Sequence, residues 1–221
     1  MARAPHYLCV MRAPILPVVM LSLAGLLGAC RPDRAPASST PPATGESRAV
    51  EYPNPRPKPD FTLTATDGTP FAFRRDTEGY LTLLFFGYTS CPDVCPVHMA
   101  NLAAALHKLP DRISRRVKVV FVTTDPERDT PERLRVWLDH FDKGFVGLTG
   151  TVAEIDSTQR LLRVPPAVRE DIGDGRYLIG HVAHIIVFTR DGLGRFAFPF
   201  GTRQADWARE LPALVEIGAG S

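Results

Sequence analysis

The sequence has little net charge of either sign. It carries 26 basic and 24 acidic residues among 221, and two of the basic ones, Arg3 and Arg12, precede Cys30. The rest of the chain is therefore nearly neutral. Nucleic-acid binding draws most of its free energy from neutralising phosphates. The charge balance therefore argues against a nucleic-acid partner, and a hydrophobic content of 44% argues against a disordered chain.

Long apolar runs are also scarce. The run from Ile15 to Leu27 carries no charge, but it is too short for a confident membrane span. It follows a positively charged start and ends in Leu-Gly-Ala before Cys30, which resembles the lipobox of bacterial lipoproteins. We predict a lipoprotein-type signal peptide over residues 1–29 and lipid attachment at Cys30. The alternatives are an ordinary signal peptide or an uncleaved anchor, and each of them also places the body outside the cytoplasm.

The segment over residues 30–59 is dense in Pro, Ser, Thr and Ala. Such a composition buries too little apolar surface to become ordered. We predict that it forms a flexible tether, which leaves the folded domain membrane-anchored and facing the periplasm or another extracytoplasmic space.

Residues 60–217 read as one folded domain without an internal repeat. Apolar runs typical of buried strands alternate with segments of helical periodicity, and Asp67-Gly68 favours a hairpin at the start of the domain. These patterns predict an α/β fold with a central mixed sheet, helices on both faces and an N-terminal β-hairpin. The predicted strands cover 61–64, 70–73, 81–86, 117–122, 145–148, 184–189 and 195–200, and the predicted helices cover 95–109, 131–141, 151–162 and 205–215.

Only two of the four cysteines, Cys91 and Cys95, lie within this domain. They follow a predicted buried strand and open a predicted helix, which is where α/β proteins commonly place functional groups. A helix N-terminus lowers the pKa of a thiol, and a three-residue spacer lets both sulfurs face one external point. This arrangement predicts a shared metal, although a structural disulfide is also compatible with the spacing.

Two thiolates leave a metal short of ligands, so a histidine is expected to join them. Three of the six histidines, His98, His107 and His140, lie on predicted helices, where exposure to solvent is the simpler interpretation. A metal shared by Cys95 and His98 is a weaker alternative. His6 lies in the predicted signal peptide, so His181 and His184 remain, at the start of a predicted central strand.

Several motifs resemble those of the Sco/SenC family of copper proteins, which take part in cytochrome c oxidase assembly. They are Phe-Phe-Gly-Tyr-Thr-Ser-Cys-Pro-Asp-Val-Cys-Pro over residues 85–96, Asp-Pro-Glu-Arg-Asp-Thr-Pro over residues 125–131 and Leu-Thr-Gly-Thr over residues 148–151. The resemblance covers roughly residues 55 to 216. It implies a thioredoxin-like fold for the folded part of the chain.

The resemblance also selects the histidine ligand. The family's metal histidine follows a tyrosine by four positions, as His181 follows Tyr177. Gly180 and Val182 replace the polar neighbours that the family usually has, which removes their hydrogen bonds from the site. His184 stays an additional candidate, and its simpler role is that of a packed strand residue.

Two thiolates and one imidazole suit copper, Cu(I) or Cu(II), better than zinc, which normally takes a fourth ligand. We predict that Cys91, Cys95 and His181 bind copper, and that the chain is a metallochaperone for the copper subunit of cytochrome c oxidase rather than an enzyme. An upstream copper donor and a thiol reductant are implied, because the sulfurs bind metal only when reduced.

A thiol-disulfide oxidoreductase acting on the cysteines of the oxidase copper subunit is the main alternative, since the same thiols serve both tasks. A peroxidase is disfavoured, because the Pro and Thr arrangement of peroxiredoxins is missing before Cys91. Four charged residues are predicted to line the site or dock a partner, with turn and capping roles as the alternative for those of the 125–130 loop: Asp93, Asp125, Arg128 and Asp129.

Overall fold

The computed structural model describes residues 47–220. The predicted signal peptide and the predicted lipid site at Cys30 lie outside the described residues. Within the described part, no helix is long and apolar enough to cross a membrane.

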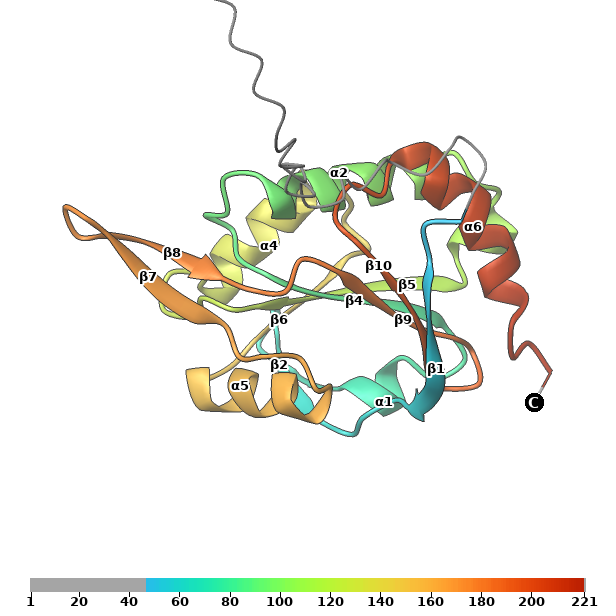
Figure 1. Cartoon of the computed structure of the whole chain (residues 1–221), viewed down its shortest axis with the longest axis horizontal. Helices are drawn as coiled ribbons and strands as arrows, with labels where there is room; N and C mark the ends of the chain where they lie inside the picture. The colour runs from blue at the N-terminus through green and yellow to red at the C-terminus, as the bar shows by residue number, and fades with distance from the viewer. Residues whose placement is uncertain (1–46, 221) are drawn as a thin grey trace, which may run out of the picture. The chain divides into compact units, whose positions relative to one another are not determined.

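An eight-stranded mixed sheet forms the centre of the domain, in the order β1-β10-β9-β4-β5-β6-β2-β3 (Figure 1). A separate two-stranded sheet, β7-β8, projects beside it. The strands are β1 Val50–Pro57, β2 Thr62–Ala65, β3 Pro70–Ala72, β4 Leu81–Gly87, β5 Val117–Thr123, β6 Val146–Thr149, β7 Val168–Gly173, β8 Arg176–Gly180, β9 Ile185–Phe188 and β10 Leu193–Phe198. The helices are α1 Phe73–Asp76, α2 Val94–Leu106, α3 Asp111–Ser114, α4 Pro131–Asp139, α5 Val152–Leu161 and α6 Gln204–Glu216.

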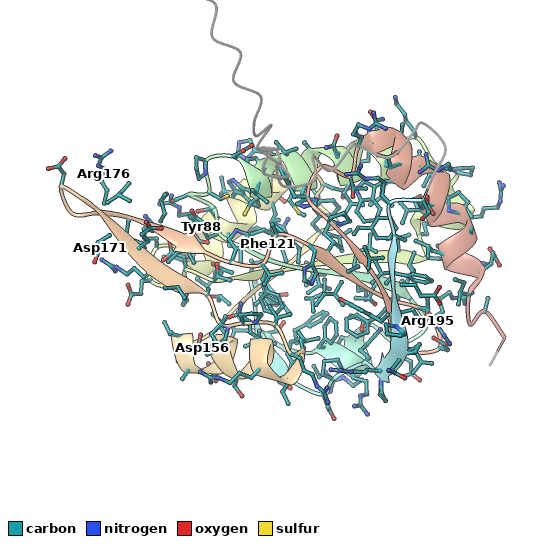
Figure 2. The ribbon with its side chains drawn as sticks, viewed as in Figure 1. Tyr88, Phe121, Asp156, Asp171, Arg176 and Arg195 are labelled. Atoms are coloured by element: carbon teal, nitrogen blue, oxygen red, sulfur yellow. The ribbon has the colours of Figure 1, made fainter. Side chains whose placement is uncertain are left out.

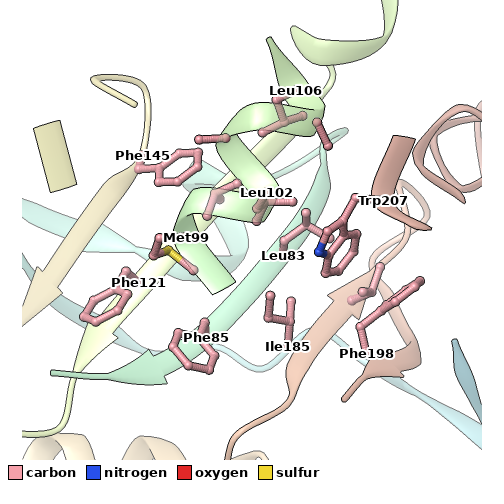
Figure 3. Packing of buried hydrophobic residues seen from close by; sticks show 14 of the residues in the cluster. Leu83, Phe85, Met99, Leu102, Leu106, Phe121, Phe145, Ile185, Phe198 and Trp207 are labelled. Atoms are coloured by element: carbon pink, nitrogen blue, oxygen red, sulfur yellow. The ribbon is translucent and has the colours of Figure 1, made fainter. Parts of the chain in front are cut away.

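Helices cover both faces of the sheet, with α2, α4 and α6 on one side and α1 and α5 on the other (Figure 1). The middle strand β4 is buried along its whole length and pairs parallel with β5 and antiparallel with β9. Because successive side chains of a strand point to opposite faces, β4 contributes to two cores. Leu83 and Phe85 pack with Met99 of α2 and Trp207 of α6, whereas Phe86 joins the core under α1 and α5. Figure 3 shows the first of these cores.

The predicted α/β architecture is confirmed. The N-terminal hairpin pairs Thr62 with Ala72 and Thr64 with Pro70. The four predicted helices are present, with ends that differ by a few residues. Thr130 caps α4 by accepting a hydrogen bond from the Arg133 N–H, as its place before Pro131 predicts.

The prediction that the tether extends to residue 59 is wrong for the last part of that segment. Residues 50–57 form β1, which pairs antiparallel with β10 at the edge of the sheet. Proline is tolerated on an edge strand because its missing N–H can face solvent, so a Pro-rich composition did not exclude a strand here. Lys58 then enters the protein interior, where its side chain donates hydrogen bonds to Thr77 and Thr82.

The β7-β8 hairpin was not predicted. Every residue of its first strand is exposed. A strand that buries no face needs no alternation of apolar and polar residues, so its sequence gives no strand signal. Asp171 and Arg176 lie on the part of the hairpin that projects from the sheet (Figure 2). The second strand ends at Gly180, directly before His181, so the hairpin determines where that histidine begins its approach to the sheet.

Candidate metal centre

Cys91 and Cys95 lie where β4 leaves the sheet and α2 begins. Cys95 is fully buried on the first turn of α2, and Cys91 is half-buried on the preceding loop. Gly87, the last residue of β4, makes room for the inner sulfur. A Cβ atom there would lie 2.8 Å from the Cys95 Sγ and 2.9 Å from the Phe85 ring, closer than atoms pack in proteins.

The two thiols have opposite electrostatic environments. Hydrogen bonds from the Cys95 thiol and from the backbone N–H groups at the start of α2 lower the pKa of Cys91 well below that of a free thiol. The interaction with the Cys91 thiolate, together with burial, raises the pKa of Cys95. The pair therefore holds one negative charge on the more accessible sulfur, and Cys95 keeps its proton until a cation replaces it.

His181 completes a cluster of three ligand atoms. Its Nε2 lies 3.4 Å from the Cys95 Sγ, although the two residues are 86 positions apart. The two sulfurs and a ring nitrogen of His181 all lie within 4.8 Å of one another. The rings of Phe85 and Tyr88 lie nearly perpendicular to the imidazole, with centroids 5.8 and 5.7 Å from it.

The tautomer of His181 follows from its other nitrogen. Nδ1 lies 3.0 Å from the carbonyl oxygen of Val182, which can only accept, so Nδ1 carries the proton. The Nε2 lone pair is then free on the side of the sulfurs. Two soft sulfur donors and one imidazole nitrogen fit a soft metal ion, and the described residues show no other such cluster of three or more His, Cys, Asp or Glu residues.

Residues 50–216 match the SCO1/SenC family profile. The chain belongs to the SCO1/SenC family. The mitochondrial SCO2 protein of Saccharomyces cerevisiae is 31% identical over 142 residues, which are 64% of this chain and 46% of that protein. This chain thus aligns with about half the length of the yeast relative.

Solved structures of Sco proteins resemble this chain closely. Copper-bound ScoI of Bradyrhizobium japonicum is 34% identical, with a TM-score of 0.63, and the match covers 72% of this chain and 99% of that one. Apo Sco1 of Thermus thermophilus is 31% identical, with a TM-score of 0.68, and the match covers 78% and 99%. The predicted thioredoxin-like fold is confirmed by these neighbours.

In this SCO1/SenC chain the loop before Cys91 is held by a buried carboxylate. Asp129 is fully buried and accepts hydrogen bonds from the backbone N–H and hydroxyl of Thr89 and from the hydroxyl of Thr123. Arg133 donates to the hydroxyls of Thr89 and Ser90. Asp129 therefore supports the cysteine loop from behind, and it is absent from the ligand cluster.

A second network holds the base of the hairpin that leads to His181. The Tyr177 hydroxyl donates a 2.9 Å hydrogen bond to Asp125, which also accepts from Arg128. The Tyr177 ring lies between the guanidinium groups of Arg128 and Arg169, at 3.6 and 3.7 Å from its centroid. Asp125 and Arg128 thus hold the base of the hairpin that leads to His181. Their role in lining the site or docking a partner stays a prediction.

The structure corrects the interpretation of His98 as a solvent-exposed residue. It is 1% exposed, and its Nε2 lies 3.0 Å from the carbonyl oxygen of Ala183. Burial lowers its pKa, so the neutral ring donates this bond and ties α2 to the segment carrying His181. A sequence signal existed, because Cys95 precedes His98 by three positions and Leu102 follows it by four, which places His98 on one helix face with two buried residues.

The remaining predicted residues contribute no side-chain ligand to the cluster. His184 is absent from it and lines a cavity under the opposite face of the sheet. The Asp93 side chain is exposed, and its backbone N–H points to the Cys91 sulfur. His107 pairs with Asp142, and the His140 Nδ1 lies 2.7 Å from the Val136 carbonyl oxygen of its own helix.

Proposed function

We propose that this protein binds copper as cargo through Cys91, Cys95 and His181 and assists assembly of the copper centre of cytochrome c oxidase. The observation that supports it most is the meeting of two sulfurs and one free imidazole nitrogen from distant parts of the chain. The copper-bound state of the Bradyrhizobium japonicum relative adds support.

The Cys91 thiolate would receive the cation first, because it carries the charge and is the more accessible sulfur. Binding then makes Cys95 lose its proton, and His181 adds a neutral nitrogen donor. Oxidation of the pair, one thiolate and one thiol, would remove two electrons and one proton and join the sulfurs, which takes both donors from the metal. We therefore propose an upstream thiol reductant and a copper donor as partners, with the oxidase copper subunit as recipient.

Titration of the reduced protein with Cu(I) and with Zn(II) tests this function. We expect stoichiometric copper binding that is lost in Cys91→Ser and weakened strongly in His181→Ala. His140→Ala is the matched control, because this exposed histidine directly follows α4 and its Nδ1 lies against the Val136 carbonyl oxygen of that helix. His184→Ala should bind like the wild type. Undiminished copper binding in His181→Ala would contradict the proposed ligand set.

A thiol-disulfide reductase is the second candidate, and the asymmetry of the two thiols favours it. An accessible thiolate beside a buried protonated thiol is the arrangement that starts disulfide exchange. Reduction of a cysteine-containing peptide from an oxidase copper subunit distinguishes the two candidates. Rapid turnover that is unaffected by His181→Ala, without copper binding, would favour the reductase.

We further propose that the protein is exported and anchored by lipid at Cys30. The support is the sequence alone: a charged start, an apolar run and a small-residue motif before that cysteine. Mass spectrometry of the mature N-terminus should find lipid-modified Cys30. An unmodified N-terminus at another residue would contradict the anchor.

A further inference from the structure

A cavity of about 370 Å³ lies under the face of the sheet opposite the thiols. It is bounded by β1, by the end of α5 with the residues that follow it, and by β9. Its floor includes Ile186 and Phe188, which belong to the core under α1 and α5, whereas Cys95 belongs to the other core. The volume falls within the range of small-molecule sites, which is about 300–1,000 Å³.

The lining is apolar with a basic rim. Leu161 is 57% exposed beside Leu162 and Val164, so an apolar surface continues from the floor to the opening. The ionisable side chains of the lining are two arginines, Tyr52 and His184, and no carboxylate is among the lining residues. Within the described residues, no salt bridge joins Arg56 or Arg163 to a carboxylate, and the ionisable neighbour that Arg56 acts on is the Tyr52 phenol of the same lining. Two guanidinium groups therefore lack anionic partners at the edge of an apolar hollow.

The backbone at Arg163 gives an independent indication. This residue follows the C-terminal end of α5 with a φ of 56°, in the left-handed region where helices usually place glycine. A residue with a Cβ atom costs about 1–2 kcal/mol in that conformation. Strained positions of this kind cluster at ligand-binding and active sites, and here the strain puts an arginine rather than a glycine at the rim of the cavity.

We propose that this cavity binds a small amphiphilic organic anion. Its aromatic or branched aliphatic body would lie on Ile186 and Phe188, and its carboxylate, sulfonate or phosphate group would pair with Arg56 and Arg163. A metal ion does not fit, because His184 is the only His, Cys, Asp or Glu residue of the lining. The site is separate from the copper ligands and does not depend on the proposed copper function.

Titration of the full chain with 8-anilinonaphthalene-1-sulfonate tests the proposal, with the uncharged N-phenyl-1-naphthylamine as a comparison ligand. We expect saturable binding of the sulfonate that weakens about ten-fold in the double variant Arg56→Gln/Arg163→Gly, because both ion pairs are removed. The uncharged compound should bind both proteins equally. Arg74→Gln is the matched control, since Arg74 is an exposed arginine outside this cavity.

Methyl NMR locates the probe. Signals of Ile186 and Val164 should shift on addition of the sulfonate, and those of Leu102 on α2 should not. Arg163→Gly should also unfold at the same or higher denaturant concentration than the wild type, which separates a loss of binding from a loss of folding. Shifts confined to the α2 face, or equal losses of affinity in Arg74→Gln, would overturn the proposal. Absence of saturable binding would overturn it as well. Occupation of the cavity by residues 1–46 of the same chain is one case of that outcome.

Discussion

The two sides of the candidate metal centre are built differently. Cys91 and Cys95 join a strand buried along its whole length to a helix of the main core, and Asp129 fixes their loop from within the protein. His181 follows a two-stranded hairpin whose first strand is fully exposed, and it is held by a few contacts: two aromatic rings, the carbonyl of Val182 and the tie from His98 to Ala183.

This difference predicts which variants should lower stability and which should lower copper affinity alone. A change on the cysteine side disturbs the core, so it should lower stability and copper affinity together. A change on the histidine side alters the position of one ligand on a segment outside the main sheet. It should lower copper affinity with little loss of stability.

Asp129→Ala should have the largest effect. It removes the acceptor for the Thr89 N–H and for the hydroxyls of Thr89 and Thr123 inside the protein. We expect a loss of about 3–5 kcal/mol of unfolding free energy in urea, together with weaker copper binding. Asp156→Ala is the control, because that carboxylate pairs with Arg160 on the surface and should contribute less than about 1 kcal/mol. Equal losses of stability in Asp129→Ala and Asp156→Ala would show that Asp129 does not anchor the cysteine side of the site to the core.

Lys58 offers a way to change stability without touching either side of the site. Burial lowers its pKa from 10.5 to about 8, and it lies near the start of β4, whereas the cysteines follow the end of that strand. At pH values between about 8 and 10.5, Lys58 is protonated in the unfolded chain but largely not in the folded protein. The unfolded chain then binds more protons, so stability rises with pH. We expect a gain of about 2 kcal/mol from pH 8 to 10.

Urea unfolding of Lys58→Met supplies the matched measurement. The unfolding free energy of the wild type minus that of Lys58→Met should rise by about 2 kcal/mol from pH 8 to 10, because the other titrating groups are the same in both proteins. Copper affinity at a fixed pH should be unaffected. A difference that stays constant with pH would mean that Lys58 keeps an ordinary pKa.

His98→Phe tests the histidine side. The ring keeps its packing against Phe85 and Phe200, but the donor to the Ala183 carbonyl is removed. We expect about a five-fold loss of copper affinity in a chelator competition and a stability loss of only about 1 kcal/mol. His107→Phe changes a histidine at the exposed end of the same helix and should leave copper affinity intact. A large stability loss without a change in copper affinity would show that His98 supports the core and does not position His181.

Tyr177→Phe should give the smallest effect. It removes the hydrogen bond to Asp125 but leaves a ring between the guanidinium groups of Arg128 and Arg169. We expect a two- to three-fold loss of copper affinity, roughly the free energy of half a hydrogen bond. Tyr177→Leu also eliminates the ring and should weaken binding further, because each cation–π interaction with a guanidinium group is worth about 0.5–1 kcal/mol. Equal effects of the two variants would show that the ring stacking does not position His181.

Much of the fold could be read from the sequence because its signals are local. The apolar run of β4, the helical spacing after Cys95 and the Thr130-Pro131 start of α4 each depend on neighbours within a few residues. Strands without such signals were missed. β1 is rich in proline and β7 is fully exposed, so their pairing depends on β10 and β8 rather than on their own composition.

The sequence by itself determined the type of site: two thiols at the start of a helix, and a histidine four residues after a tyrosine, all matching one family. Only the tertiary structure decided which residues work together. It brought His181 to the sulfurs, sent His184 to the opposite face of the sheet and turned His98 inward. The reason is physical: His181 and His184 lie on the irregular connection between β8 and β9, so no local periodicity fixes which face of the sheet each of them meets, and contacts with residues far away in the chain decide it.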